Sequence, residues 1–123
     1  MDSPEVTSVP IDAVPAEFDA ASVAGTGAGG AMVLLDVRED DEWRLGHAPG
    51  AIHIPMVDVP ARLDELDYDA DIYVVCRQGG RSIQVVKYLN QIGFEAVDVA
   101  GGMVAWQHAG RPVVGDGDEA KIY

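Results

Sequence analysis

Cys76 is the only cysteine of the sequence and lies in "VVCRQGGRS", residues 74–82. An apolar run precedes it, a glycine pair follows it, and arginines stand at positions 77 and 81. A helix that starts near Ser82 would point its free amide groups toward the sulfur, and the glycines let loop amides turn the same way. Amide groups and arginines both favour the thiolate, which is the nucleophilic form of cysteine. The stretch therefore predicts an anion-binding loop with a nucleophilic sulfur at its base.

The candidate site extends from the sulfur into the loop that follows it. We expect Cys76 to be catalytic and the next six residues to bind the substrate, namely Arg77, Gln78, Gly79, Gly80, Arg81 and Ser82. The simpler alternative is a buried cysteine that only fills the core, followed by a tight glycine turn and a solvent-facing Arg77. The catalytic interpretation is favoured because two arginines, two glycines and the start of a helix surround one sulfur.

Asp36 and Arg38 in "LLDVRED" stand at the end of another apolar run. We predict that they form a structural ion pair that fixes the strand end, and both are candidates for the border of the pocket. The histidines, at positions 47, 53 and 108, lack the paired spacing of metal ligands, and no second cysteine completes a zinc site. The sequence therefore predicts neither a metal nor a cofactor.

Short apolar runs alternate with helix-like segments along the chain. Strands are expected at 6–10, 32–37, 51–55, 71–76 and 95–100, and helices at 15–22, 39–46, 59–66, 82–93 and about 103–109. Ser82 can cap the start of the fourth helix and Gly93 can end it. The alternation predicts an α/β sandwich with a mainly parallel central sheet and helices on both faces. Ligands of such sheets bind at the carboxyl ends of the strands, where Cys76 stands.

The length of 123 residues fits one domain. We expect this domain to span 5–114, with a flexible N-terminus at 1–4 and a flexible acidic C-terminal tail at 115–123. The formal net charge of −13 makes nucleic acids and membrane surfaces poor partners. The first residues lack the basic start and apolar core of a signal peptide, so we expect a cytoplasmic protein.

Three segments resemble the rhodanese homology domains. "CRQGGRS" is similar to their active-site loop, Cys-x-x-Gly-x-Arg followed by Ser, and matches every fixed position of that pattern. "LLDVREDDEWRLGHAPGAIHIP", at 34–55, resembles their Asp-Val-Arg strand end followed by Gly-His-x-x-Gly-Ala. "AGGMVAWQHAGRPV", at 100–113, is similar to their C-terminal Gly-Gly-x-x-x-Trp segment. The resemblance implies a single-domain, rhodanese-like three-layer sandwich.

The resemblance also implies a sulfurtransferase. Such an enzyme moves sulfane sulfur from thiosulfate or a persulfide donor to cyanide or another thiol, through a persulfide on Cys76. The partners implied are a small anionic sulfur donor and a thiol or protein acceptor. From cysteine to arginine the loop counts six residues, as in sulfur-handling members, whereas related phosphatases and arsenate reductases carry one more. A sulfur-carrier or binding module that serves a protein partner is the alternative function, and phosphatase or arsenate reductase chemistry is a distant third.

Overall fold

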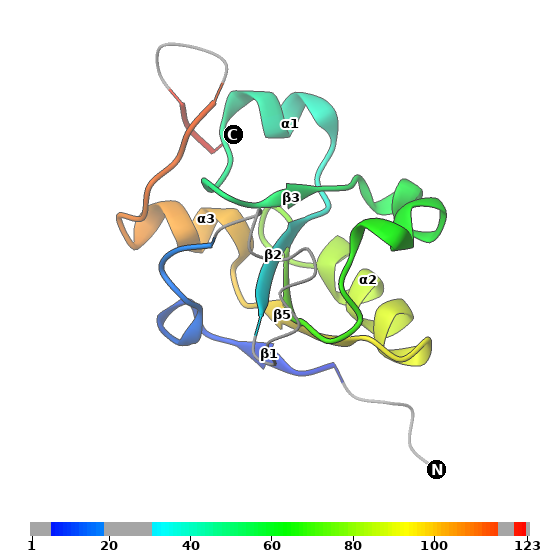
Figure 1. Cartoon of the computed structure of the whole chain (residues 1–123). Helices are drawn as coiled ribbons and strands as arrows, with labels where there is room; N and C mark the ends of the chain where they lie inside the picture. Colours follow the sequence, from blue (N-terminus) through cyan, green and yellow to red (C-terminus); the bar gives the residue numbers. More distant parts are fainter. Residues whose placement is uncertain (1–5, 19–30, 116–119, 123) are drawn as a thin grey trace.

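The centre of the fold is a parallel five-stranded sheet (Figure 1). The computed structural model describes residues 6–18, 31–115 and 120–122. Its strands are β1 (Ser8–Val9), β2 (Met32–Asp36), β3 (Ile52–His53), β4 (Asp71–Val75) and β5 (Glu95–Val99). They lie in the order β1-β5-β4-β2-β3, and every neighbouring pair is parallel. The predicted parallel α/β sheet is therefore confirmed.

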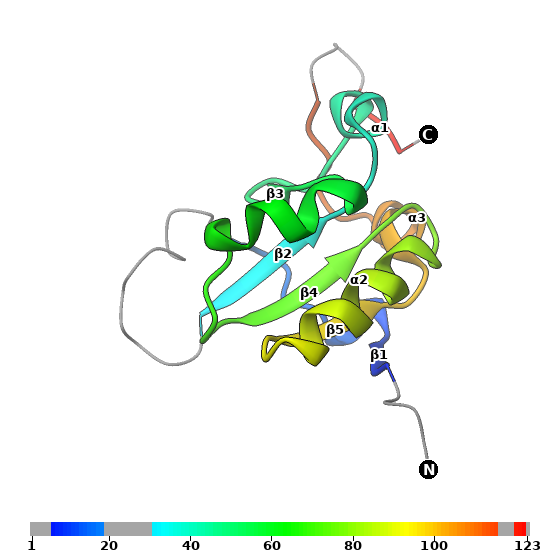
Figure 2. The same ribbon diagram turned by 90° about the vertical axis from the view of Figure 1, so that its right-hand side faces the viewer.

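Helical segments surround this sheet. They are η1 (Ile11–Ala13), α1 (Asp40–Leu45), η3 (Met56–Glu65), α2 (Arg81–Gln91) and α3 (Gly102–His108). Figure 2 shows α2 and η3 in front of the sheet and α3 behind it. Val59 of η3 and Val85 of α2 belong to one core cluster, and Trp106 of α3 belongs to a second. Among the described residues, no helix is long and apolar enough to cross a membrane.

Burial on both faces explains the apolar runs of the two central strands. In β2, Val33 and Leu35 contribute to the cluster under α2, while Leu34 contributes to the cluster under α3. Successive side chains of a strand point to opposite faces, so a strand covered on both sides must be apolar throughout. The first polar residue after such a run therefore marks the edge of the core, where a functional site can begin.

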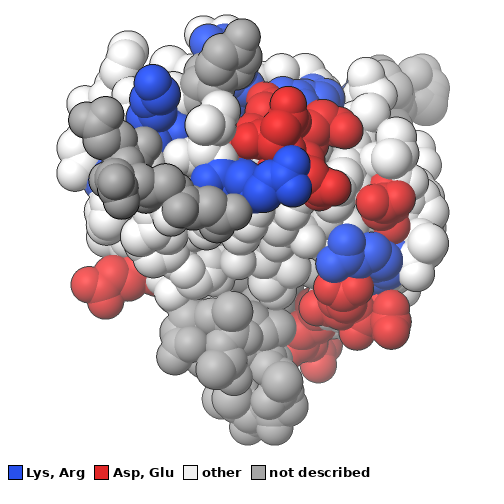
Figure 3. Space-filling view, turned by 90° about the horizontal axis from the view of Figure 1, so that it is seen from above, with Lys and Arg blue, Asp and Glu red and all other residues white. Residues whose placement is uncertain are grey.

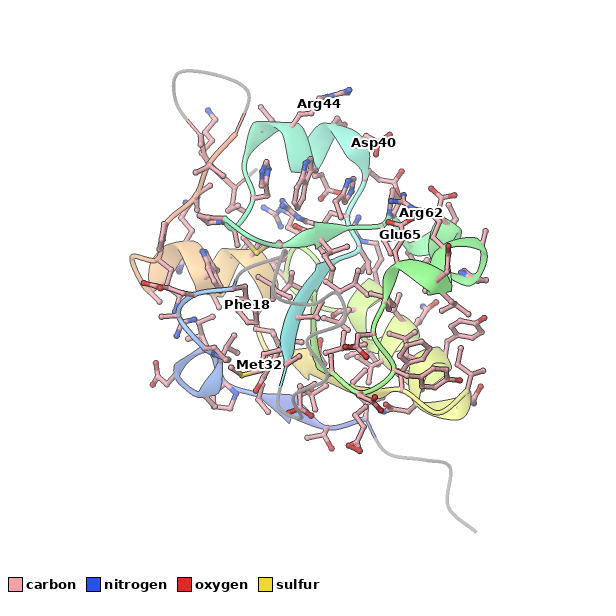
Figure 4. The ribbon with its side chains drawn as sticks, viewed as in Figure 1. Phe18, Met32, Asp40, Arg44, Arg62 and Glu65 are labelled. Atoms are coloured by element: carbon pink, nitrogen blue, oxygen red, sulfur yellow. The ribbon has the colours of Figure 1, made fainter. Side chains whose placement is uncertain are left out.

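The predicted helix at 59–66 is wrong in type. The segment is a 3₁₀ helix, Met56–Glu65, with non-helical angles at Arg62 (φ −123°, ψ 25°) and Pro60 inside it. Proline has no amide hydrogen to donate and crowds the preceding turn, so a regular α-helix does not continue through it. Arg62 and Glu65 form an exposed ion pair with an N–O distance of 2.6 Å and lie side by side in Figure 4.

The helix α1 lies beyond the carboxyl end of β2, above the sheet in Figures 1 and 2. Its Asp40 and Arg44 lie on the outer side of the molecule (Figure 4). On the inner side, the ring of Trp43 stacks against His47 at 3.6 Å and against His53 at 4.6 Å. Trp43 is half-buried, so it packs under α1 and not in the central core.

Several expected segments lie partly outside the described residues. Of the helix expected at 15–22, residues 15–18 are not helical and the remainder is outside the described ranges. The N-terminus at 1–4 and residues 116–119 are also outside them, so the limits of the domain stay a prediction. In the described part of the C-terminal segment, the amide of Lys121 donates to the carbonyl of Leu45 (3.0 Å), which joins this segment to α1.

Candidate active site

Cys76 comes directly after the last residue of β4, at the carboxyl end of a central strand, and has no exposed surface. In the loop that follows, Gly79 and Gly80 have φ values of 146° and 98°. The space around their missing Cβ atoms is open, so the need for glycine comes from the backbone conformation. A side chain at either position would strain the loop that covers the sulfur.

The helix α2 begins at Arg81, with Gly80 as its N-cap residue. The prediction that Ser82 caps this helix is wrong, because Ser82 already lies inside the first turn. No side chain caps α2, so its first amide groups have no side-chain acceptor. Such amides favour an anion at the helix start. At the other end, Gly93 follows the helix with a φ of 103°, as the sequence predicted.

Two hydroxyl groups and one carboxylate form a hydrogen-bonded chain that ends at the sulfur. The Oγ atom of Ser82 lies 3.3 Å from the Sγ atom of Cys76. The same hydroxyl donates to Oδ1 of Asp98 at 2.6 Å, and the hydroxyl of Ser8 donates to Oδ2 at 2.8 Å. Ser82 and Asp98 are both buried. The side chain of Ser82 therefore faces the interior below the loop.

Arg81 forms a two-pronged ion pair with Glu42 of α1. Its Nη1 and Nη2 atoms donate to the two carboxylate oxygens at 2.7 and 3.1 Å. The hydrogen bond from Arg81 is the largest influence on Glu42 and lowers its pKa, while burial acts in the opposite direction. The same bond is the main cause of the raised pKa of Arg81, and the charge of Cys76 adds to that rise. The positive charge near the sulfur is thus partly balanced by Glu42.

The start of α3 binds the backbone of the loop that begins at Cys76. The amides of Met103 and Val104 donate to the carbonyls of Cys76 (2.9 Å) and Arg77 (3.0 Å). Gly102 has a φ of 55°, and a Cβ atom there would collide with both carbonyl groups. The helix can approach the loop this closely only because residue 102 has no side chain.

Asp36 and Arg38 form the buried pair that the sequence predicted. The Nη2 atom of Arg38 lies 2.7 Å from Oδ2 of Asp36, and it also donates to the carbonyl of Gly46. Asp36 is paired in register with Val75, the residue before the cysteine. The pair therefore fixes the end of β2 to the turn after α1. Its place at the border of a pocket stays a prediction.

The remaining loop residues lie toward solvent. Gln78, Gly79 and Gly80 are exposed, while Arg77 is half-buried and donates from Nη1 to Oε1 of Gln78 at 3.1 Å. The predicted site thus has an exposed rim and a buried base formed by Cys76 and Ser82. Within the described ranges, no group of three His, Cys, Asp or Glu side chains is placed to hold a metal ion.

Sequence reasoning missed three residues of this site, namely Ser8, Glu42 and Asp98. A signal existed for Asp98, because a charged residue interrupts the apolar run "EAVDVA". For Glu42 no signal existed, since it pairs with a residue 39 positions away. Figure 3 looks down on α1 and shows acidic and basic side chains close together on this face.

The comparison with protein families agrees with this geometry. The family model of the rhodanese-like domain matches residues 19–109, which is most of the chain. The chain belongs to the rhodanese-like domain family. The predicted family and fold are therefore confirmed for this rhodanese-like domain.

Individual proteins of this family are similar to the chain in sequence and in structure. The domain is 46% identical over 81 residues to YtwF of Bacillus subtilis, provisionally named a sulfurtransferase, and the match covers 66% of this chain and 79% of that protein. It is 39% identical over 74 residues to YrkF of the same organism, provisionally named a sulfur carrier protein, covering 59% of this chain and 40% of that one. The crystal structure of a rhodanese-like domain protein from Staphylococcus aureus superposes with a TM-score of 0.66 at 34% identity, covering 82% and 91% of the two chains. These names place the domain in a family of sulfurtransferases that includes sulfur carriers.

Proposed function

We propose that this rhodanese-like domain transfers sulfane sulfur through a persulfide on Cys76. The observation that carries the proposal is the position of the sulfur at the base of a glycine-containing loop, beside the uncapped start of α2. A thiolate and a persulfide are both anions, and free helix amides favour an anion. The site therefore suits both the thiolate and the persulfide of Cys76, which the reaction requires.

The reaction proceeds in two displacements. The Cys76 thiolate attacks the outer sulfur of thiosulfate, a new S–S bond forms, and sulfite leaves with the electron pair of the broken S–S bond. Cyanide or an acceptor thiolate then attacks the outer sulfur of the persulfide. The product takes that sulfur, and Cys76 leaves as a thiolate with the bonding electrons. No external oxidant or reductant enters this cycle, because sulfur moves as a neutral atom between nucleophiles.

We assign binding of the anionic donor to the loop residues after the cysteine. The amides around Gly79, Gly80 and the helix start would hold its charged oxygens. Arg81 and Arg77 would add positive charge, although Arg81 shares its charge with Glu42. Gln78 at the exposed rim and Ser82 at the buried base complete the set of proposed donor-binding residues.

The length of the loop supports sulfur over larger oxyanions. From Cys76 to Arg81 it has six residues, and the phosphatases and arsenate reductases that the sequence resembles more distantly have one more. We propose that the functional unit is the range 5–114, that it works in the cytoplasm, and that its partners are a small anionic donor and a thiol or protein acceptor.

A sulfur carrier that serves one protein partner is the second candidate. The name of YrkF as a provisional sulfur carrier protein favours it. The two candidates differ in the acceptor and share the Cys76 persulfide. An enzyme forms thiocyanate from thiosulfate and cyanide, whereas a carrier passes its persulfide to a protein thiol and forms little thiocyanate.

Intact mass spectrometry after incubation with thiosulfate tests the shared persulfide. We expect the wild-type chain to gain the mass of one sulfur atom and to lose it again with cyanide or dithiothreitol. The Cys76→Ser variant should gain nothing under the same conditions. A wild-type chain that takes no sulfur from thiosulfate or from a low-molecular-weight persulfide would contradict both candidates.

A further inference from the structure

The strand register places a buried carboxylate on the same face of the sheet as the catalytic sulfur. Asp98 of β5 pairs with Val74 of β4 and with Ser8 of β1. Cys76 lies two residues after Val74, so alternation along the strand turns both side chains to one face. The helix α2 covers this face and contributes Ser82. The contact between sulfur, hydroxyl and carboxylate follows from this arrangement.

The directions of the hydrogen bonds are fixed by the chemistry of the groups. An ionised carboxylate only accepts hydrogen bonds, so both serine hydroxyls must donate to Asp98. Ser82 has a single hydroxyl hydrogen, and this hydrogen is used in the 2.6 Å bond. Its oxygen therefore presents a lone pair to the sulfur 3.3 Å away. Such an oxygen can accept a hydrogen bond from a thiol, but it offers no hydrogen to a thiolate.

We propose that Asp98 is a positioning residue that acts through Ser82 to favour the thiol and the persulfide of Cys76 over its bare thiolate. A persulfide carries its negative charge on the outer sulfur, so the inner Sγ atom is neutral and tolerates the lone pair of Ser82. A thiolate concentrates the charge on Sγ itself, beside that lone pair and one hydroxyl group away from a carboxylate. The persulfide part of this inference rests on the proposed function, whereas the thiol part does not.

The other charged groups around the sulfur act in mixed directions. Arg81 at the start of α2 and Arg77 in the loop attract a thiolate, and Glu42 of α1 offsets the first of them. At the end of β2, Asp36 and Arg38 are paired with each other, so their opposite charges largely cancel. From α3, two amides bind loop carbonyls and do not bind the sulfur. Asp98, which reaches the sulfur through Ser82, thus acts against the attraction that Arg81 exerts on a thiolate.

The first test uses the reduced protein without any sulfur donor. The rate of Cys76 alkylation by iodoacetamide, measured by intact mass across a pH series, gives the pH midpoint of the thiol. Asp98→Asn keeps the shape of the side chain and removes its charge, so we expect the midpoint to fall by about one pH unit. Glu95→Gln removes one exposed charge from the same strand and should leave the midpoint unchanged. An unchanged or raised midpoint in Asp98→Asn would overturn the proposal.

Ser82→Ala separates the two possible directions of the hydrogen bond. If Ser82 donated to a thiolate, its loss would raise the midpoint. If Asp98 holds Ser82 as an acceptor for the thiol, its loss lowers the midpoint, which is the result we expect. In the Ser82→Ala background, Asp98→Asn should then have less effect than in the wild type. Equal shifts in both backgrounds would mean that the charge acts only through space, and would contradict a role through Ser82.

The second test measures sulfur retention. After loading with thiosulfate, the persulfide of Asp98→Asn should discharge to dithiothreitol about three times faster than that of wild type, because a more stable thiolate is a better leaving group. Equal discharge rates would overturn the persulfide part of the inference. If the wild type takes up no sulfur, the proposed function fails, and the alkylation test still decides the thiol part by itself.

Discussion

At the scale of single residues, the charged side chains near the sulfur are held by partners from other segments of the fold. Arg81 of α2 binds Glu42 of α1 through both of its terminal nitrogens. Arg38 binds Asp36 at the end of β2 and also reaches a carbonyl after α1. Substitution of one partner therefore changes both the local charge and the fixation of another element.

Glu42→Gln should make the domain less stable at neutral pH by about 1 kcal/mol, as expected for a partly exposed ion pair. The pKa of Glu42 is lowered in the folded state, mainly by Arg81. A lowered carboxyl pKa adds stability above its ordinary value of 4.5, and this stability is lost as the pH falls through the lowered value. Urea unfolding at pH 7 and pH 3 should thus show a difference between wild type and variant that shrinks in acid.

Glu65→Gln is the matched control for this experiment. Glu65 also forms an ion pair with an arginine, Arg62, but the carboxylate side chain is 42% exposed, against 14% for Glu42. Water and salt screen such a pair, so we expect a smaller change in stability. A larger loss in Glu65→Gln than in Glu42→Gln would contradict the importance given to the pair beside the catalytic loop.

Arg38→Met should destabilise the domain by about 3–5 kcal/mol, because it leaves the carboxylate of Asp36 buried without its partner. The double variant Asp36→Asn/Arg38→Met removes both charges and should recover part of this loss. Thermal or urea unfolding of the wild type, Asp36→Asn, Arg38→Met and the double variant measures the effect. If the double variant is as unstable as the sum of the single variants, the two side chains do not act as a pair.

At the scale of elements, the loop after Cys76 lies between the starts of two helices. The start of α2 continues the loop and carries uncapped amides. The start of α3 approaches from the opposite side and binds the carbonyls of Cys76 and Arg77. Under the proposed function the amides of α2 would bind the donor, whereas those of α3 fix the loop. Because α3 fixes the backbone of the loop, the loop geometry also depends on Gly102 of that helix.

Gly102→Ala should disrupt this contact, because the new Cβ would collide with the loop carbonyls at a φ of 55°. We expect a cost of about 1–2 kcal/mol from the backbone angle and about 1–3 kcal/mol from the collision. The amount of sulfur that Cys76 takes up from thiosulfate should also fall, because the loop is displaced. Unfolding curves and the intact-mass assay measure the two effects.

Gly110→Ala is the matched control for Gly102→Ala. Gly110 also has a positive φ, 77°, but the space around it is open. Its substitution should lower the stability only by the contribution of the backbone angle, and it should leave sulfur loading unchanged. Equal losses of stability and loading in both variants would show that the approach of α3 to the loop is unimportant.

Some elements could be predicted from the sequence and others could not, for physical reasons. Buried strands such as β4 appear as continuous apolar runs, and the loop after β4 was visible through its glycines and arginines. The 3₁₀ segment was predicted as an α-helix because its apolar residues follow a helical pattern. The effect of Pro60, which has no amide hydrogen to donate, was given too little weight. Asp98 escaped because its partners depend on strand order, which places β5 beside both β1 and β4. Composition and periodicity carry no direct information about that order.

At the scale of the whole molecule, the formal charge of −13 opposes the approach of an anionic donor. Acidic and basic side chains are mixed on the face above α1 (Figure 3), so local attraction there is limited. Long-range repulsion acts over about 10 Å at ordinary salt and further at low salt. In the proposed reaction, the loop after Cys76 would have to attract the donor against the negative field of the whole molecule.

Salt should accordingly accelerate the reaction with thiosulfate. We expect kcat/KM for thiosulfate to rise when ionic strength increases from about 10 to about 200 mM, because the net repulsion is screened. The alkylation of Cys76 by iodoacetamide, which is uncharged, should show no such rise. A steady fall in kcat/KM with salt would mean that the arginines of the loop dominate the approach of the donor.

The single buried cysteine also determines how this domain responds to oxidants. A sulfenic acid formed on Cys76 finds no second thiol in the chain with which to condense into a disulfide. Recovery therefore needs a thiol from outside, and a reductant that cannot reach the buried sulfur leaves the oxidised form to proceed toward irreversible sulfinic acid. During purification and storage, a small thiol reductant should preserve the active form better than a bulky one.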